Sequence, residues 1–270
     1  MKRLVFIFFL TLFFLTPARA ADTFAEQATN PSAEQAVQSI QEPLILSAQA
    51  LDTDGDGLTD EQEINIYHTN PNDPDTDTDG FEDGIEIKNN FSPLVAGKKI
   101  YEADYDEDGL SDGAEFNLGA DPTNKDTDGD GYPDGVEVRN GYDPVNPEPI
   151  KLPKSILVDL KTQTLTYFLG DKKIENFLIS SGIARLPTPK GEFKVLKKKP
   201  IVHYKGPGYD LPNTKWNLLF SQRGGGIFIH GAYWHNKFGQ PMSHGCVNVS
   251  YKNMEPLYAY AEVGTKVIIK

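Results

Sequence analysis

The sequence has very little cysteine. Its 270 residues contain one, Cys246, together with five histidines, two tryptophans and three methionines. A lone thiol excludes an intrachain disulfide and the cysteine-rich zinc sites of small metal-binding modules. Such a thiol is either a small buried hydrophobic residue or a reactive group. The residues around Cys246 therefore have to decide its role.

Long apolar runs are also scarce. The run from Leu4 to Leu15 follows Lys2 and Arg3 and is interrupted only by Thr11. It is shorter than the roughly 20 residues of a membrane-spanning helix. The small-x-small sequence at Ala18 to Ala20 then predicts that residues 1–20 are a cleaved signal peptide for export to the periplasm or cell wall. An uncleaved anchor is the alternative, and no transmembrane span is expected once the signal is cleaved.

Each half of the chain has few charges of one sign. Residues 51–150 hold 28 acidic against 5 basic residues, whereas residues 151–270 hold 7 acidic against 18 basic residues, within a net charge of −13. An acidic half repels phosphate, and the basic half has no arginine-rich or aromatic-interleaved patch. We therefore expect two domains and no nucleic-acid partner. Residues 21–50, rich in Ala, Gln and Ser, are predicted to be a flexible linker.

Four repeats in register occupy the acidic half. They begin at Asp52, Asp75, Asp104 and Asp126, and each has carboxylates at positions 1, 3, 5, 9 and 12 with glycine at position 6. The candidate metal ligands are Asp52, Asp54, Asp56, Asp60, Glu63, Asp75, Asp77, Asp79, Asp83, Glu86, Asp104, Asp106, Asp108, Asp112, Glu115, Asp126, Asp128, Asp130, Asp134 and Glu137.

This spacing suits calcium. Ca²⁺ takes six to eight oxygen ligands, and one tight loop supplies them when glycine forms the bend and a glutamate closes the shell. A short helix is expected after each closing glutamate, ending at Gly119 and Gly141 in the last two repeats. The alternative is a solvated acidic spacer that binds no metal.

Residues 51–147 resemble bacterial thrombospondin type 3 calcium repeats, most clearly from Asp121 to Glu137. The resemblance implies structural Ca²⁺ and an irregular, calcium-stapled module over residues 51–149, with a cell-envelope protein as a candidate partner. Without metal, the like charges repel and the few apolar residues do not offset chain entropy. The prolines from Pro144 to Pro153 predict a stiff, extended linker after the repeats.

The basic half has strand patterns. Residues 155–160, 164–169, 173–180, 192–196, 227–230 and 266–270 are predicted strands, and residues 251–262 are the one convincing helix, with Ser250 as N-cap. The fold class is therefore mainly β, an antiparallel sandwich or small barrel with a minor helix over residues 150–270.

The chemistry is concentrated in His230-Gly231 and in Ser243-His244-Gly245-Cys246-Val247-Asn248. A thiol becomes a nucleophile when an imidazole takes its proton, and backbone amides beside a glycine can stabilise an oxyanion. The alternative is a zinc site formed by Cys246, His244, His230 and His235, although the spacing does not favour it.

These motifs resemble the L,D-transpeptidase (YkuD) catalytic domain, as do Ser180-Ser181-Gly182 and the Thr188-to-Phe193 segment. The resemblance implies Cys246 as nucleophile, His230 as its base and the Gly231 carbonyl as the group that orients His230. His244, Gly245 and Asn248 would shape the oxyanion pocket. No cofactor is implied for catalysis.

The implied function is acyl transfer in cell wall biogenesis, with a role in cell shape. Cys246 would cleave the terminal D-alanine from a peptidoglycan tetrapeptide stem through a thioester and pass the acyl group to an amine. Two alternatives remain at this stage: an L,D-carboxypeptidase on the same scaffold, and a calcium-dependent wall-binding or adhesion protein. A further hypothesis is that opposite charges hold the two halves together and that calcium tunes their release.

Overall fold

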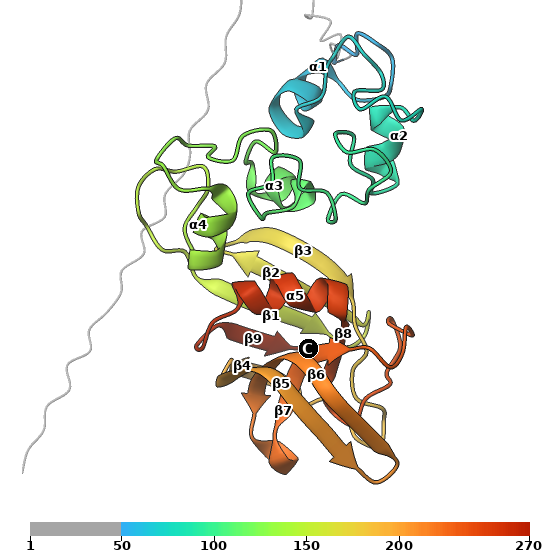
Figure 1. Cartoon of the computed structure of the whole chain (residues 1–270), viewed down its shortest axis with the longest axis vertical. Helices are drawn as coiled ribbons and strands as arrows, with labels where there is room; N and C mark the ends of the chain where they lie inside the picture. The colour runs from blue at the N-terminus through green and yellow to red at the C-terminus, as the bar shows by residue number, and fades with distance from the viewer. Residues whose placement is uncertain (1–49) are drawn as a thin grey trace, which may run out of the picture. The chain divides into compact units, whose positions relative to one another are not determined.

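The repeats and the basic half are both described by the computed structural model, which covers residues 50–270 (Figure 1). The predicted signal peptide and residues 21–49 of the predicted linker lie outside the described residues. Residues 50–270 belong to one structural unit. Within them, no helix combines the length and the apolar character that a membrane crossing requires.

Each repeat is a loop followed by a short helix that begins at its ninth position. The helices are α1 (Asp60–Gln62), continued by the π-turn η1 (Glu63–Tyr67), then α2 (Asp83–Lys88), α3 (Asp112–Leu118) and α4 (Asp134–Asn140). An aspartate at the start of a helix is favourable because it faces the positive end of the helix dipole. The prediction that each helix follows the closing glutamate is wrong, because every helix begins three residues before it. The predicted ends are confirmed: α3 and α4 end at Gly119 and Gly141, whose φ angles of 80° and 84° are left-handed.

The repeats pack in two pairs, the first with the second and the third with the fourth. In each pair the glycine after the helix-starting aspartate donates its N–H to the position-5 aspartate of the preceding loop, Gly84 to Asp56 and Gly135 to Asp108. A Cβ at Gly84 would lie 2.4 Å from the Asp56 carbonyl oxygen, and one at Gly135 would lie 2.8 Å from that of Asp108. Only glycine permits this approach, and the first repeat, which follows no other, has Glu61 instead.

Two sheets form the rest of the chain (Figure 1). The first has the order β3-β2-β1-β9-β4, and the second has the order β5-β6-β7-β8. The strands are β1 (Lys154–Asp159), β2 (Thr164–Leu169), β3 (Lys172–Leu178), β4 (Gly191–Lys194), β5 (Lys197–Gly206), β6 (Tyr209–Ser221), β7 (Ile227–Ala232), β8 (Val247–Ser250) and β9 (Lys266–Ile269). A 3-10 turn, η2 (Arg223–Gly225), precedes β7, and α5 (Tyr251–Tyr260) links β8 to β9.

The predicted mainly-β class is confirmed, but the purely antiparallel arrangement is wrong. β1 pairs with β9 and β7 pairs with β8 in parallel. Each parallel pair is joined by a connection long enough to cross over, as parallel neighbours require. Three strands, β5, β6 and β8, were not predicted, and Ser250 caps α5 as expected by accepting the Asn253 N–H at 3.3 Å.

The proline-rich segment after the repeats is not an extended linker. The Leu152 N–H donates to the Gly141 carbonyl at 2.8 Å, and Tyr142 forms an antiparallel bridge with Lys151. The segment between them is therefore a closed loop that returns to the end of α4 just before β1 begins.

The third and fourth repeats share the hydrophobic core of the strands. Leu110, Ala114, Leu118 and Val138 are buried in the same cluster as residues of both sheets and α5. Lysines complete the contact: Lys172 donates to the Leu118 carbonyl at 2.8 Å, and buried Lys154 donates to the carbonyls of Arg139 at 2.6 Å and Tyr260 at 3.0 Å. Two ion pairs, Lys172 with Asp143 at 3.4 Å and Lys252 with Glu102, also join the halves. Opposite charges therefore contribute to a contact that apolar packing and lysine–carbonyl hydrogen bonds also form.

Candidate functional site

The thiol and the histidine predicted to act together do meet at one cavity. β7 carries His230, and Cys246 stands immediately before β8, which runs parallel to β7 with His230 opposite Asn248. The cavity has a volume of about 150 Å³. Its lining residues are Tyr204, Tyr209, Leu211, His230, Trp234, Met242, Ser243, His244, Cys246 and Asn248.

His230 is held in one tautomer and one orientation. Its Nδ1 lies 2.9 Å from the Gly231 carbonyl oxygen, which only accepts hydrogen bonds, so Nδ1 carries the hydrogen and Nε2 is the basic nitrogen. The imidazole is 3% exposed and lies near two aromatic rings, with centroid distances of 4.8 Å to Tyr204 and 5.8 Å to Trp234. Nε2 is thereby left free to accept a proton, as a general base must.

Burial keeps the thiol and the imidazole neutral. It raises the pKa of the Cys246 thiol to about 11 and lowers the pKa of His230 to about 4. The Phe228 N–H, 3.5 Å from the sulfur, partly opposes the first effect by favouring the thiolate. At neutral pH the pair therefore rests as thiol and imidazole, and the proton moves when the sulfur attacks.

Side-chain hydroxyls fix the loop before the thiol. Ser243 Oγ donates to the Cys246 carbonyl at 2.5 Å and accepts the Gly245 N–H at 3.1 Å. Thr188 Oγ1 lies 3.4 Å from the same carbonyl and accepts the Gly182 N–H at 2.9 Å. The Ser180-to-Gly182 and Thr188 segments singled out in the sequence thus support the loop that carries Cys246.

The three residues predicted to shape the oxyanion pocket have different surroundings. His244 is exposed and stacks on Tyr209 with ring centroids 5.2 Å apart. Gly245 supplies a left-handed bend, φ 118°, while its N–H is already donated to Ser243. Asn248 is 2% exposed, and its Nδ2 lies 3.1 Å from His235 Nε2. His235, considered in the sequence only as a zinc ligand, is thus the partner of Asn248.

No zinc site forms here. Within residues 50–270, the only groups of three or more metal-ligating side chains whose ligand atoms lie close together are four aspartate triplets. Arg185, Arg223 and Tyr233 are exposed and do not line the cavity. Sequence reasoning missed Tyr204, Tyr209 and Leu211, because they belong to the unpredicted β5 and β6.

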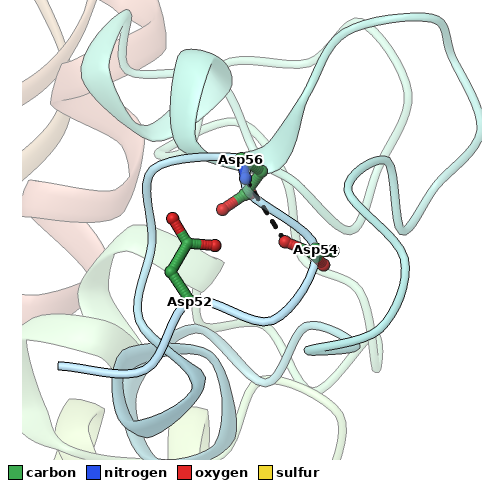
Figure 2. Close-up of side chains that lie close together, drawn as sticks. All are labelled: Asp52, Asp54 and Asp56. Atoms are coloured by element: carbon green, nitrogen blue, oxygen red, sulfur yellow. Dashed lines mark hydrogen bonds between the residues drawn. The ribbon is translucent and has the colours of Figure 1, made fainter.

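Each repeat gathers three carboxylates, from positions 1, 3 and 5. In every triplet one ligand atom per residue lies within 4.8 Å of the others. Figure 2 shows Asp52, Asp54 and Asp56 turned into the interior of the first loop, with the Asp56 N–H donating to Asp54 at 3.3 Å. The second repeat, from Asp75, has the same triplet as the other three.

The closing glutamates and the triplets have buried oxygens without hydrogen-bond partners. One oxygen of each position-3 aspartate and at least one of each position-12 glutamate is buried without a hydrogen-bond partner. Burial, reinforced by neighbouring carboxylates, raises the pKa of Glu63 to about 7, of Glu86 and Glu137 to about 8 and of Glu115 to about 10. Buried acceptors aimed at one another need a cation between them. An all-oxygen set of this kind fits Ca²⁺.

The position-9 aspartates do not join the triplets. Asp60, Asp83 and Asp134 each accept an N–H and a hydroxyl hydrogen from one threonine, which is Thr53, Thr76 and Thr127 respectively. Asp112 accepts from the Tyr105 N–H and the Ser92 hydroxyl. Both oxygens of each accept hydrogen bonds within the fold, so these four aspartates brace the loop against its helix, and their role as calcium ligands stays a prediction.

Both the acidic and the basic half of the chain are similar to known protein families. Residues 153–269 match the model of the L,D-transpeptidase catalytic domain, and residues 52–74, 104–125 and 126–147 match the bacterial TSP3 repeat. Bacillus subtilis YkuD, assigned as an L,D-transpeptidase, is 29% identical over 123 residues, which are 46% of this chain and 70% of that protein. YqjB of the same organism, with the same assignment, is 29% identical over 42% of this chain and 69% of its own.

Solved structures of the same description are also similar. An L,D-transpeptidase from Mycobacterium smegmatis is 26% identical, with a TM-score of 0.42 over 44% of this chain and 59% of its own. A mutant of the Enterococcus faecium L,D-transpeptidase is 28% identical, with a TM-score of 0.41 over 48% of this chain and 54% of its own. This chain therefore spans somewhat more than half of each of these two structures.

Proposed function

Because this chain carries an L,D-transpeptidase catalytic domain preceded by bacterial TSP3 repeats, we propose that it is an exported cysteine L,D-transpeptidase that acts on peptidoglycan stems. The observation that carries the proposal is the meeting of the chain's one thiol with a buried, tautomer-fixed imidazole at the cavity. We place the repeats in residues 51–149 and the catalytic domain in residues 150–270, in the periplasm or cell wall after signal cleavage.

The first step is acylation of Cys246. Its sulfur attacks the carbonyl carbon of the third stem residue while His230 Nε2 takes the thiol proton. The bond to the terminal D-alanine then breaks, and the imidazolium returns that proton to the departing amine. The product is a thioester on Cys246, and the imidazole is neutral again.

The second step transfers the acyl group. An amine from a neighbouring stem or an envelope protein attacks the thioester carbon, His230 Nε2 accepts the amine proton, and the proton passes to the departing sulfur. A 3-3 cross-link or an attached protein results. Because Nδ1 stays bound to the Gly231 carbonyl, the same nitrogen serves both steps.

The cavity lining suits the uncharged part of a stem. No Lys, Arg, Asp or Glu is among its residues, while Tyr204, Leu211 and Met242 supply apolar surface. Asn248 has a second amide hydrogen besides the one that faces His235. We place the developing oxyanion near this amide and His244, where a neutral, partly buried site strengthens hydrogen bonds to it.

Calcium enters as a structural ion of the repeats. The position-1, -3 and -5 aspartates and the closing glutamate of each repeat would hold it, with the orphaned oxygens as ligands. Bound calcium would neutralise the mutual repulsion of these carboxylates and so order the loops.

Mass spectrometry of purified tetrapeptide muropeptides tests the proposal. We expect cross-linked dimers that have lost one D-alanine with the unmodified protein, and none with Cys246→Ala. Tripeptide monomers without dimers would identify water as the acceptor and make the protein an L,D-carboxypeptidase. No product from wild type, with calcium present and an envelope protein offered as acceptor, would refute an enzymatic role and leave a wall-binding protein.

A further inference from the structure

Two grooves of the same make-up lie on the second and fourth repeats. Each has a volume of about 300 Å³. Counted from the first aspartate of its repeat, both are lined by positions 5, 7, 11, 12, 15 and 17; Gly97 and Lys99 complete the first lining, and Pro149 completes the second. The residues at the shared positions are Asp79, Phe81, Ile85, Glu86, Asn89 and Phe91 in one groove, and Asp130, Tyr132, Val136, Glu137, Asn140 and Tyr142 in the other.

Each groove combines one free aromatic ring with one fixed ring. Phe81 and Tyr132, at position 7, are each 61% exposed. The position-17 rings have a lysine ammonium over them, Lys99 at 3.3 Å from the Phe91 centroid and Lys151 at 5.5 Å from that of Tyr142. The same lysines form antiparallel bridges with these residues, so the second ring of each groove is fixed on both sides.

The amide at position 15 is oriented alike in both grooves. Asn89 Nδ2 donates to the Ile85 carbonyl, and Asn140 Nδ2 donates to the Val136 carbonyl, both at 2.8 Å. This bond leaves Oδ1 as an exposed acceptor beside the rings. Each groove thus offers stacking surface and a hydrogen-bond acceptor.

Packing within the repeats does not explain the exposed rings. In the first and third repeats the position-7 residues are Leu58 and Leu110, which are 6% and 8% exposed. Only in the repeats that end a pair, where no following helix covers the loop, is position 7 aromatic. Leucine thus stands where the fold buries this position, and an aromatic ring stands where solvent reaches it, which indicates a ligand.

Charge and chemistry select the class of ligand. Two carboxylates line each groove, against the single ammonium of Lys99 in one of them, within a half of the chain that holds 28 acidic and 5 basic residues. This balance disfavours anionic lipids and nucleic acids. Sugar rings present apolar C–H faces to aromatic rings, and their hydroxyls donate to amide and carboxylate oxygens. Two equivalent sites in one chain suit a polymer with a repeating unit.

We propose that these grooves are two equivalent, calcium-dependent sites for an uncharged glycan strand that carries N-acetyl groups. The proposal rests on the proposed function in that such a strand bears the stems on which Cys246 would act. Calcium dependence follows from the lining, since Asp79, Glu86, Asp130 and Glu137 are also candidate calcium ligands. The repeats would then hold the polymer while the catalytic domain works on its side chains.

Titration calorimetry of the full chain with a β-1,4-linked N-acetylglucosamine hexamer tests this. We expect binding in calcium and none in chelator. Phe81→Ala and Tyr132→Ala should each weaken binding roughly 3- to 10-fold, and the double variant should abolish it. Phe81→Tyr and Tyr132→Phe should retain it. Ile64→Ala is the matched control, since Ile64 is 55% exposed in the first repeat, away from both grooves.

Absence of hexamer binding in calcium, binding that persists in chelator, or binding unaffected by the double variant would overturn the proposal. So would a basic, leucine-rich peptide that binds in place of the hexamer and is lost in the double variant, because the grooves would then be protein-docking sites. Tetrapeptide turnover measured on the same preparations separates this test from that of the proposed function. Hexamer binding without turnover would support the glycan sites and contradict the proposed function. Turnover without hexamer binding would support the proposed function and contradict the glycan sites.

Discussion

At the scale of the residue, the neutral thiol–imidazole pair determines how the reaction depends on pH. With the pKa of His230 lowered to about 4, kcat/KM should keep its full value well below pH 6.5 and fall only as His230 becomes protonated near pH 4. Without substrate, the rate of Cys246 alkylation by iodoacetamide should rise only as the pH approaches the pKa of the buried thiol, about 11. An unperturbed thiol, with a pKa of about 8.5, would react rapidly at a lower pH. An acid limb near pH 6.5, or fast alkylation at pH 7, would instead show a preformed thiolate–imidazolium pair.

A second residue-scale prediction concerns Glu175 on β3, which is 8% exposed and accepts a hydrogen bond from Tyr167 at 3.3 Å. Burial raises its pKa to about 7. The folded state therefore binds a proton that the unfolded state releases near pH 4.5, and stability falls as pH rises from 4.5 to 7. Glu175→Gln should raise the free energy of unfolding by about 1 to 3 kcal/mol at pH 8 and change it little at pH 4. Urea titrations at the two pH values compare these effects, and equal effects would exclude a titrating Glu175.

At the scale of the element, replacing the glycines that join the repeats by alanine should destabilise the protein, although Gly→Ala in a helix usually stabilises it. Gly→Ala in a helix usually stabilises by about 0.5 to 1 kcal/mol. At Gly84 and Gly135 the new methyl would meet a backbone carbonyl at 2.4 and 2.8 Å, so each substitution should destabilise the repeats by about 1 to 3 kcal/mol. Calcium-dependent circular dichroism during thermal unfolding measures this. Glu61→Ala, at the same position of the first repeat, is the control and should have little effect.

The sequence predicted the elements that have local signals and missed those that depend on distant contacts. The repeat helices, β1, β2 and α5 follow from periodicity, caps and glycine stops. The β5–β6 hairpin does not, because Pro200 and Pro212 interrupt it and Trp216 has a φ of 56°, all against a strand pattern. The thiol and its base were found from their motif, whereas three of the ten residues that line the cavity come from that hairpin.

At the scale of the whole molecule, calcium should stabilise the catalytic half as well as the repeats. Leu110, Ala114, Leu118 and Val138 from the third and fourth repeats are part of its core. Losing one buried leucine costs about 2 to 5 kcal/mol, and unfolding of the third repeat would remove two, Leu110 and Leu118. Both tryptophans, Trp216 and Trp234, lie in the catalytic half, so the unfolding midpoint of their fluorescence should fall on chelation.

Matched substitutions locate the effect within the repeats. Asp104→Asn with Asp126→Asn should lower the tryptophan midpoint in calcium, because these loops carry the core-forming helices. Asp52→Asn with Asp75→Asn should lower it much less. Equal midpoints with and without calcium would show that the catalytic half folds independently of the repeats. If calcium instead released the catalytic domain by weakening the charge attraction, the tryptophan unfolding midpoint should rise on chelation.

The pairing of the repeats has a consequence for how such a gene can change its length. Removal or insertion of a single repeat would separate Leu58 or Leu110 from the helix of the next repeat, which approaches through Gly84 or Gly135. It could also place Glu61, at the position of these glycines, against a preceding loop. Gain or loss by twos preserves the contacts within each pair. Lineages descended from this gene should therefore differ in repeat number by even steps, with aromatic residues retained at the end of each pair.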